Sequence, residues 1–382
     1  MHRSWVVVGA GVAGSVVAAR LLEAGASAVS LLDLGSDHPT TNDLTAAVNV
    51  EGRTIDDLFV RRVKGGPRVR YTSGSGLGGG SAINGLVLAT TGPFAHDLRI
   101  PVERSYGVRR QTRNGQRVTT AEAYLGSTDV ARLTVDLGVA ISRIDFDGGV
   151  ASAVSSIDGR SWEADAVVVC AGALASGPLL MRSGVVVDGL GEGLQDHPSI
   201  TCRFQRLDSD PDGIHDLNRD RDVQSIAMTI ANEYVVVPAL MRPYSAGHVA
   251  LDADGRADVQ FLIGKDERDL QRLVAAVRSV GASHPNRSSL DGFSEGSTDD
   301  LEQWVHSQIA TSTPVYSHAS SGCAMGRVVD RLGRVHRYSN LFVADASVFP
   351  RIPSVNPMVP VMQLAETLVD RWIDAGLVGA MT

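Results

Sequence analysis

Short apolar runs separated by glycine-rich turns characterise the first half of the chain. Residues 5–8 and 29–32 are two such runs, and each has the length and composition of a buried strand. Residues 15–24 lie between them with the apolar spacing of a helix, while residues 166–170 form a third apolar run that ends in small residues. Strands that alternate with a helix predict an α/β fold built on a parallel sheet.

The pattern changes after residue 200. Residues 234–237 and 259–263 are strand candidates, and two later segments, 266–280 and 297–309, each carry a row of apolar side chains at helical spacing. These rows are Leu270, Leu273, Val274 and Val277 in the first segment and Leu301, Trp304, Val305 and Ile309 in the second. We therefore expect a smaller α+β section that covers one side of the first unit.

Composition fits a globular protein with more than one domain. The chain has 382 residues, of which 43% are hydrophobic and 20% charged, and a length of this size favours two domains. Its net charge of −8 gives no reason to expect a nucleic-acid partner. No apolar run approaches the roughly 20 residues needed to span a bilayer, and no cleavable segment precedes the first strand, so a cytoplasmic location is expected.

The cysteines indicate neither a disulfide framework nor a metal site. Cys170, Cys202 and Cys323 are odd in number, lie far apart and form no C-x-x-C pair. We therefore predict no metal.

The first strand is followed by the pattern G-x-G-x-x-G, formed by Gly9, Gly11 and Gly14. Between a strand and a helix, such glycines permit a tight turn, close approach of the backbone to a pyrophosphate and close packing of helix on strand. Asp33 ends the second strand, where an acidic residue can bind the hydroxyl groups of a ribose. These residues predict a bound dinucleotide, and at this point FAD and NAD both remain open.

A second glycine cluster, at residues 73–85, contains Leu77, Gly78, Gly79, Gly80 and Asn84. It is too rich in glycine for the interior of a helix or strand, and apolar runs flank it on both sides. The cluster resembles the flavin-contacting loop of the glucose–methanol–choline (GMC) oxidoreductases, which has the pattern G-G-S-S-x-x-N-G. This resemblance favours FAD over NAD.

The resemblance extends over nearly the whole chain, with five family motifs in the family's order. Residues 193–198 match one further motif, and His318 matches the active-site histidine, although residues 319–321 differ from the usual pattern. Asp345 and Ala346 match a segment that contacts FAD, and Asn356 takes the place where relatives have His or Asn.

The resemblance implies a GMC-type α/β fold: a Rossmann-like FAD-binding domain plus a smaller α+β substrate domain. We assign residues 1–96, 118–198 and 318–382 to the first and residues 97–117 and 199–317 to the second. The implied cofactor-binding residues are Gly9, Gly11, Val12, Ala13, Gly14, Asp33, Leu77, Gly78, Gly79, Gly80, Asn84, Ile141, Gly172, Asp345, Ala346 and Met358. The FAD is expected to be non-covalent.

The chemistry implied is oxidation of a small-molecule alcohol, with hydride transfer to flavin N5. His318 would take the hydroxyl proton, because an imidazole has an unperturbed pKa near 6.5. Asn356 would orient the substrate oxygen through its amide, just before a helix predicted to begin at Pro357. Electrons would pass on to oxygen or to another carrier.

Two other features are given no catalytic role. Residues 108–119 predict a hairpin about Asn114-Gly115 in which the arginines are solvated, followed by a helix capped by Thr119 and Glu122. His197, which precedes a proline, is interpreted as a hinge residue.

The chain also departs from the family in one place. Asn84 and Asn114 are close in sequence, whereas most relatives have a long segment there that includes the lid over the flavin. A shortened lid predicts a more open site.

Three alternatives remain. The protein could be a redox-inactive member of the same fold, either a lyase or a non-catalytic FAD-binding protein. It could instead be an NAD-dependent dehydrogenase, or an enzyme that uses a peptide-derived redox carrier rather than oxygen.

Overall fold

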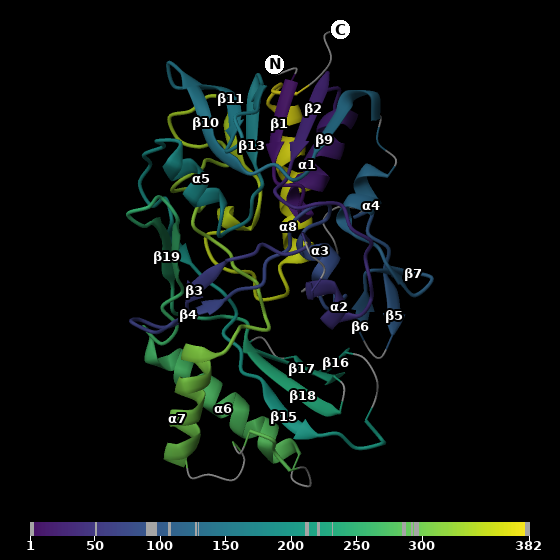
Figure 1. Cartoon of the computed structure of the whole chain (residues 1–382), viewed down its shortest axis with the longest axis vertical. Helices are drawn as coiled ribbons and strands as arrows, with labels where there is room; N and C mark the ends of the chain where they lie inside the picture. The colour runs from purple at the N-terminus through teal and green to yellow at the C-terminus, as the bar shows by residue number, and fades with distance from the viewer. Residues whose placement is uncertain are drawn as a thin grey trace.

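The computed structural model describes residues 4–49, 52–88, 98–105, 108–126, 128, 130–210, 214–219, 222–230, 232–284, 288–291, 293 and 298–378. Every structural statement below refers to these residues. The chain forms an upper part built on a parallel sheet and a lower part built on antiparallel strands and two helices (Figure 1).

The central sheet of the upper part has five strands in the order β21-β13-β1-β2-β9, and all of its neighbouring strands run parallel. These strands are β1 (Ser4–Val8), β2 (Ala28–Leu32), β9 (Leu133–Asp136), β13 (Ala166–Val169) and β21 (Leu341–Val343). In this order β1 has β2 on one side and β13 on the other, so the chain extends the sheet in both directions from β1, as in doubly wound dinucleotide-binding folds. The predicted parallel sheet is confirmed.

Successive side chains along each buried strand point to opposite faces of the sheet, and a different layer covers each face. Trp5 and Val7 face a helical layer formed by α1 (Val12–Glu23), α4 (Thr120–Leu125) and α8 (Met358–Asp374). Val6 and Val8 face a three-stranded antiparallel sheet formed by β10 (Ile141–Asp147), β11 (Val150–Ser156) and β12 (Ser161–Glu163). Because both faces are covered, the strands are continuously apolar, as the sequence pattern required.

The lower part contains a four-stranded antiparallel sheet in the order β15-β18-β17-β16. Its strands are β15 (Cys202–Gln205), β16 (Ile214–Arg219), β17 (Val223–Ile230) and β18 (Glu233–Leu240). Phe204 and Val236 on one face pack with α6 (Glu267–Ser283) and α7 (Thr298–Thr311), whereas Val235 and Val237 on the other face pack around Tyr316. The predicted α+β section is therefore present.

A mixed sheet in the order β14-β19-β20-β3-β4 joins the two parts. It consists of β3 (Phe59–Arg61), β4 (Arg68–Arg70), β14 (Glu192–Leu194), β19 (Gly247–Leu251) and β20 (Ala257–Gln260). Strand β3 lies early in the chain but pairs with β20, so strand pairing crosses the boundary expected between the domains. That boundary at residues 96 and 97 lies outside the described residues, and the division into two domains stays a prediction.

The remaining elements are short. They are α2 (Leu44–Asn49), α3 (Gly80–Ile83), β5 (Glu103–Ser105), β6 (Val108–Arg110), β7 (Thr112–Arg113), β8 (Gln116–Arg117), η1 (Val130–Arg132), α5 (Ser176–Arg182) and η2 (Ala346–Val348).

Local predictions between residues 108 and 126 are confirmed. Strands β7 and β8 form the hairpin, with Asn114 and Gly115 at φ values of 52° and 73° as a two-residue turn of this kind requires. Thr119 accepts a hydrogen bond from the backbone of Glu122, whose carboxylate in turn accepts one from the backbone of Thr119. This reciprocal pair starts α4.

No helix within the described part of the chain is both long and apolar enough to cross a membrane.

Trp372 in α8 joins the helical layer to the sheet. Its ring stacks on Trp5 at a centroid distance of 5.5 Å and lies 5.1 Å from the ring of Phe342, while its indole nitrogen donates to the carbonyl oxygen of Leu332 at 2.7 Å. The side chain is fully buried. It therefore fixes how α8 lies against β1 and β21.

We predict that Trp372→Ala lowers the free energy of unfolding by about 3–5 kcal/mol, because it removes a large buried ring and leaves a cavity. Ile373→Ala is the matched control, since the neighbouring Ile373 is 39% exposed. Urea unfolding followed by circular dichroism measures both. Equal losses in the two variants would contradict the role assigned to Trp372.

Candidate active site

The first glycine loop leaves no room for side chains at two of its positions. A Cβ on Gly9, whose φ is +105°, would lie 2.3 Å from the carbonyl oxygen of Cys170, and one on Gly14 would lie 1.7 Å from the carbonyl oxygen of Gly9. Gly11 is the N-cap of α1, with no side-chain hydrogen bond to cap the helix and no acidic residue in its first turn. The first-turn N–H groups, including those of Val12 and Ala13, therefore favour an anion.

The second glycine loop packs directly on the first. The backbone N–H of Gly78 donates to the carbonyl oxygen of Ala10 at 2.9 Å. A Cβ on Gly79 would approach the Cα of Gly11 to 2.7 Å. Two loops that are nearly 70 residues apart in sequence thus form one continuous backbone surface at the carboxyl end of β1.

Asp33 holds three loops at this edge. Its carboxylate accepts the N–H groups of Ala10 at 2.7 Å, Gly35 at 2.8 Å and Gly76 at 2.7 Å. A carboxylate has about four acceptor positions, so one remains for a ligand. The structure thus adds a structural role to the ribose contact expected for Asp33.

Asn84 is held in place by all four of its side-chain hydrogen-bonding positions. Its amide nitrogen donates to Gln111 Oε1 at 2.6 Å and to the sulfur of Met358 at 3.2 Å. Its amide oxygen accepts from Arg117 at 2.8 Å and from the backbone of Leu86 at 3.1 Å. The side chain therefore fixes the second glycine loop against the start of α8.

Arg117 was expected to be a solvated residue of the hairpin, and this expectation is wrong. Its side chain is buried and donates to the carbonyl oxygens of Ser81 at 3.0 Å, Asn84 at 2.9 Å and Thr41 at 2.7 Å. The turn sequence predicted the hairpin correctly but carried no information about which side of it would be covered.

Asp345 likewise holds loops together at this edge, in this case the loops that follow β13 and β21. Its carboxylate accepts the backbone N–H of Gly172 at 2.8 Å and the hydroxyl of Ser176 at 2.6 Å, as well as the backbone N–H of Ser347 at 2.8 Å. These contacts join the loop after β13 to the turn that begins at Ala346. All of these residues lie at the carboxyl ends of parallel strands, where open α/β sheets bind ligands.

The converging loops border open space. A Cβ on Gly80 or on Gly172 would meet no atom within 4 Å. An uncapped helix N-terminus, a free acceptor position on Asp33 and bare backbone at these glycines fit an extended dinucleotide. Ile141 lies at the start of β10 and packs against the core cluster that contains Val6 and Val8, and within the described residues no hydrogen bond joins it to the glycine loops.

His318 lies where the lower part meets this edge. Its backbone N–H donates to Asp196 at 2.9 Å, and its ring nitrogen Nδ1 lies 2.9 Å from Nδ1 of His197. The ring of Tyr316 stands edge-on at 5.0 Å. Its other ring nitrogen, Nε2, has no hydrogen-bond partner among the described residues, and the residue is mostly but not fully buried.

Asp196 fixes the backbone at both histidines. One carboxylate oxygen, Oδ1, accepts the N–H groups of His197 at 2.8 Å and His318 at 2.9 Å, and the other accepts the hydroxyl of Tyr71 at 3.0 Å. The hydroxyl oxygen of Tyr71 accepts the N–H of Ala319 at 3.0 Å. The hinge interpretation of His197 missed this contact with His318, which joins residues 121 positions apart.

Asn356 follows the loop that contacts His197. The carbonyl oxygen of Pro353 lies 3.0 Å from His197 Nε2. The predicted helix is present as α8, which begins at Met358, one residue later than predicted, with Pro357 as its N-cap. The amide oxygen of Asn356 is buried and has no hydrogen-bond partner in the described part of the chain. A buried acceptor without a donor indicates a place for a donor from a bound molecule.

Burial keeps both imidazoles neutral. It lowers the pKa of His197 to about 4, outweighing the carbonyl groups of Pro353 and Met241, which favour the protonated ring. Burial, followed by the neighbouring His197, also lowers the pKa of His318 well below its usual value. For Asp196, burial raises the pKa to about 6 against the effect of its hydrogen bonds and of Arg62. Desolvation disfavours the charged form in each case.

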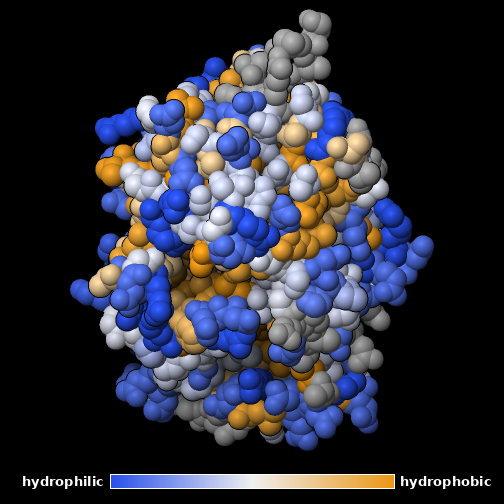
Figure 2. Space-filling model, turned by 45° about the horizontal axis from the view of Figure 1, so that its top comes forward, coloured by the Kyte–Doolittle hydropathy of each residue, from blue (hydrophilic) through white to orange (hydrophobic). Residues whose placement is uncertain are grey.

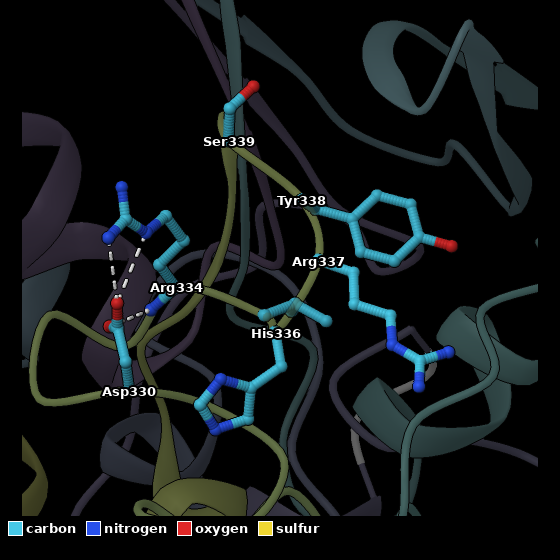
Figure 3. A pocket seen from close by; sticks show the side chains of 7 residues that line it. Asp330, Arg334, His336, Arg337, Tyr338 and Ser339 are labelled. Atoms are coloured by element: carbon cyan, nitrogen blue, oxygen red, sulfur yellow. Dashed lines mark hydrogen bonds and ion pairs between the residues drawn. The ribbon is translucent and has the colours of Figure 1, made fainter.

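Hydrophobic side chains gather in a hollow across the middle of one face of the molecule, with hydrophilic side chains above and below it (Figure 2). A second, polar pocket lies elsewhere, lined by Asp330, Arg334 and residues up to Ser339. Asp330 pairs with Arg334 at 3.0 Å, and Arg337 and Tyr338 point away from that pair (Figure 3). This pocket precedes β21 and so lies at the amino end of the sheet, opposite the glycine loops.

The sequence matches a known family in two parts. Family models described as GMC oxidoreductase match residues 93–199 and 243–365. The chain is 27% identical to an oxygen-dependent choline dehydrogenase from Paraburkholderia phymatum, in an alignment that covers 89% of this chain and 69% of that protein. It is 25% identical to an uncharacterised GMC-type oxidoreductase from Rhodococcus erythropolis, covering 96% of this chain and 97% of the relative. That alignment spans 494 positions, so the relative has segments that this shorter chain lacks.

The fold also matches solved structures. Pyridoxine 4-oxidase from Mesorbium loti superposes with a TM-score of 0.78 at 21% identity, covering 97% of this chain and 99% of the other. A formate oxidase variant from Aspergillus oryzae RIB40, studied for FAD modification, superposes with a TM-score of 0.81 at 17% identity, covering 97% and 98% of the two chains. At these identities the likeness establishes the fold.

We predict that Arg117→Met lowers the free energy of unfolding by about 2–4 kcal/mol, since it leaves several buried oxygen acceptors without a donor. Arg113→Met on the same hairpin is the control, because Arg113 is exposed and should change stability by less than about 0.5 kcal/mol. Urea unfolding followed by circular dichroism distinguishes them. A stability loss in Arg117→Met no larger than in the control would refute the role of Arg117 in holding the second glycine loop.

Proposed function

Because the chain belongs to the glucose–methanol–choline oxidoreductase family, we propose that it is an FAD-dependent enzyme that oxidises an alcohol to a carbonyl compound. The observation that carries this proposal is the neutral imidazole of His318, whose Nε2 has no partner among the described residues and which lies beside the loop that leads to Asn356. The likeness to a choline dehydrogenase and a pyridoxine 4-oxidase supports an alcohol as the substrate class.

The described residues fit FAD at the edge formed by the glycine loops. We assign the pyrophosphate to Gly11 and the uncapped start of α1, and the ribose to the remaining acceptor position of Asp33. The backbone at Gly79, Gly80 and Gly172 provides close approach without side chains. The start of α8, at Met358, supplies a helix N-terminus that favours negative charge.

FAD, when bound, supplies the acceptor for the hydride that leaves the alcohol carbon. His318 takes the hydroxyl proton on Nε2, and its lowered pKa keeps the ring unprotonated and ready to do so. Asn356 orients the hydroxyl oxygen through its carboxamide, which can donate and accept hydrogen bonds but cannot act as a base at neutral pH. The substrate thus loses a proton and a hydride, which leaves a carbonyl group.

We predict that His318→Ala lowers the rate of anaerobic flavin reduction by roughly 10²–10⁴-fold, because the proton has no acceptor, while FAD remains bound. Stopped-flow absorbance, with an alcohol that reduces the wild-type flavin, measures the rate. Asn356→Ala should reduce it less, since the amide positions the oxygen without accepting its proton.

His336→Ala is the matched control, because His336 is exposed in the polar pocket at the opposite edge of the sheet. Its rate should equal that of the wild type. Wild-type reduction rates in His318→Ala would exclude His318 as the base. Loss of FAD from that variant would instead show that the histidine acts in cofactor binding.

We further predict that the acid limb of the rate of flavin reduction lies near or below pH 6. As pH falls, His318 stays unprotonated until well below its usual pKa, and Asp196 becomes protonated near pH 6. Both changes come below neutrality, so the rate should be flat from pH 7 down to about 6. The same anaerobic measurement across pH provides the test, and an acid limb at pH 7 or above would show that His318 is not neutral in the way we describe.

A further inference from the structure

His197 is a second buried histidine that the proposed reaction does not use. Its side chain is 1% exposed, and its ring stands perpendicular to that of His318 at a centroid distance of 5.1 Å. The two Nδ1 atoms lie 2.9 Å apart. Two imidazole nitrogens at this distance must share one proton, since two lone pairs or two N–H groups would repel each other.

The position of that proton follows from the other side of the His197 ring. Nε2 of His197 lies 3.0 Å from the carbonyl oxygen of Pro353, and a carbonyl oxygen can only accept. Nε2 therefore carries a hydrogen. Because burial keeps His197 neutral, its ring has one N–H group and its Nδ1 is a lone pair.

The shared proton must then belong to His318. Its Nδ1–H donates to the Nδ1 lone pair of His197, and the neutral ring of His318 has its own lone pair on Nε2. Nε2 is the atom without a partner among the described residues, on a residue that is mostly but not fully buried. The hydrogen bonds thus leave the basic nitrogen facing away from the protein contacts.

We propose that His197 is a positioning residue that fixes His318 as the Nδ1–H tautomer, so that Nε2 is always the nitrogen available to take the substrate proton. The role resembles that of any group that orients a catalytic imidazole through its second nitrogen. Here, however, the orienting group is a neutral imidazole held by a backbone carbonyl, not a carboxylate. It therefore fixes the tautomer without placing a negative charge beside His318.

The surroundings of the pair hold this arrangement. Among the described residues, the carboxylate hydrogen-bonded to these two histidines is that of Asp196, and it binds their backbone N–H groups rather than their rings. Arg62 and Tyr71 interact with Asp196, and Tyr316 lies edge-on to both imidazoles. Within the described residues no acidic side chain is bonded to either ring. The backbone carbonyl groups of Pro353 and Met241 both favour a hydrogen on the His197 ring, and that of Pro353 lies at Nε2.

The inference rests on the proposed function only for its kinetic consequence, since the tautomer can be measured without turnover. Nitrogen-15 NMR of the FAD-loaded protein, labelled at histidine, distinguishes a protonated from an unprotonated ring nitrogen. The signals of His318 are assigned by their loss in His318→Gln. We expect His318 Nδ1 to be protonated and Nε2 to be unprotonated at pH 7.

Two variants separate tautomer control from simple packing. His197→Phe keeps the ring shape but removes the acceptor, so the signals of His318 should show a mixture of tautomers and flavin reduction should slow by roughly 10–100-fold. His197→Asn retains an acceptor near the position of Nδ1 and should restore both the Nδ1–H tautomer and most of the rate. Absorbance of bound FAD and the melting temperature check that each variant is folded.

A His318 ring protonated on Nε2 in the unmodified protein would overturn the proposal, and this result does not depend on any variant folding. Slow reduction in both His197→Phe and His197→Asn, with the tautomer unchanged, would also overturn it by showing a packing role only. If instead the tautomer behaves as expected but no alcohol reduces the flavin, the positioning role stands and the proposed reaction fails.

Discussion

The buried carboxylate of Asp196 is the constraint on which the arrangement of the candidate site depends. One of its oxygens holds the backbone of both His197 and His318, although these residues lie on different segments of the chain. Burying such a group is unfavourable unless its oxygens are hydrogen-bonded, and here the N–H donors and Tyr71 satisfy them. Because the two backbones share one acceptor, the two histidines lie side by side, and their ring nitrogens Nδ1 are 2.9 Å apart.

Carboxylates that accept hydrogen bonds from several segments are also present at the edge where we assign the cofactor. Asp33 and Asp345 each use several acceptor positions to hold loops that follow different parallel strands. Asn84 and Arg117 fix the second glycine loop in the same manner. The polar side chains therefore organise the loops, and the surface left for a ligand consists mainly of backbone, a helix N-terminus and a few unpaired groups such as the amide oxygen of Asn356.

Sequence patterns were sufficient where the determinants are local. Apolar runs and glycines predicted the parallel sheet, the Asn114-Gly115 turn predicted its hairpin, and Thr119 with Glu122 predicted the start of α4. The pairing of His197 with His318 and the burial of Arg117 could not be predicted, because both depend on segments brought together by the tertiary fold. A proline after His197 suggested a hinge, and charge on a hairpin suggested solvent, but neither local pattern specifies what packs against it.

Together these contacts describe a neutral histidine with one basic nitrogen that has no partner among the described residues, beside loops suited to FAD. The most direct measurement is a single anaerobic turnover of the purified protein, in which flavin absorbance and carbonyl product are quantified together across a panel of primary and secondary alcohols. The account predicts that at least one alcohol bleaches the flavin and yields one carbonyl product per flavin reduced. A flavin that stays oxidised with every alcohol would contradict it and would favour a redox-inactive member of the family.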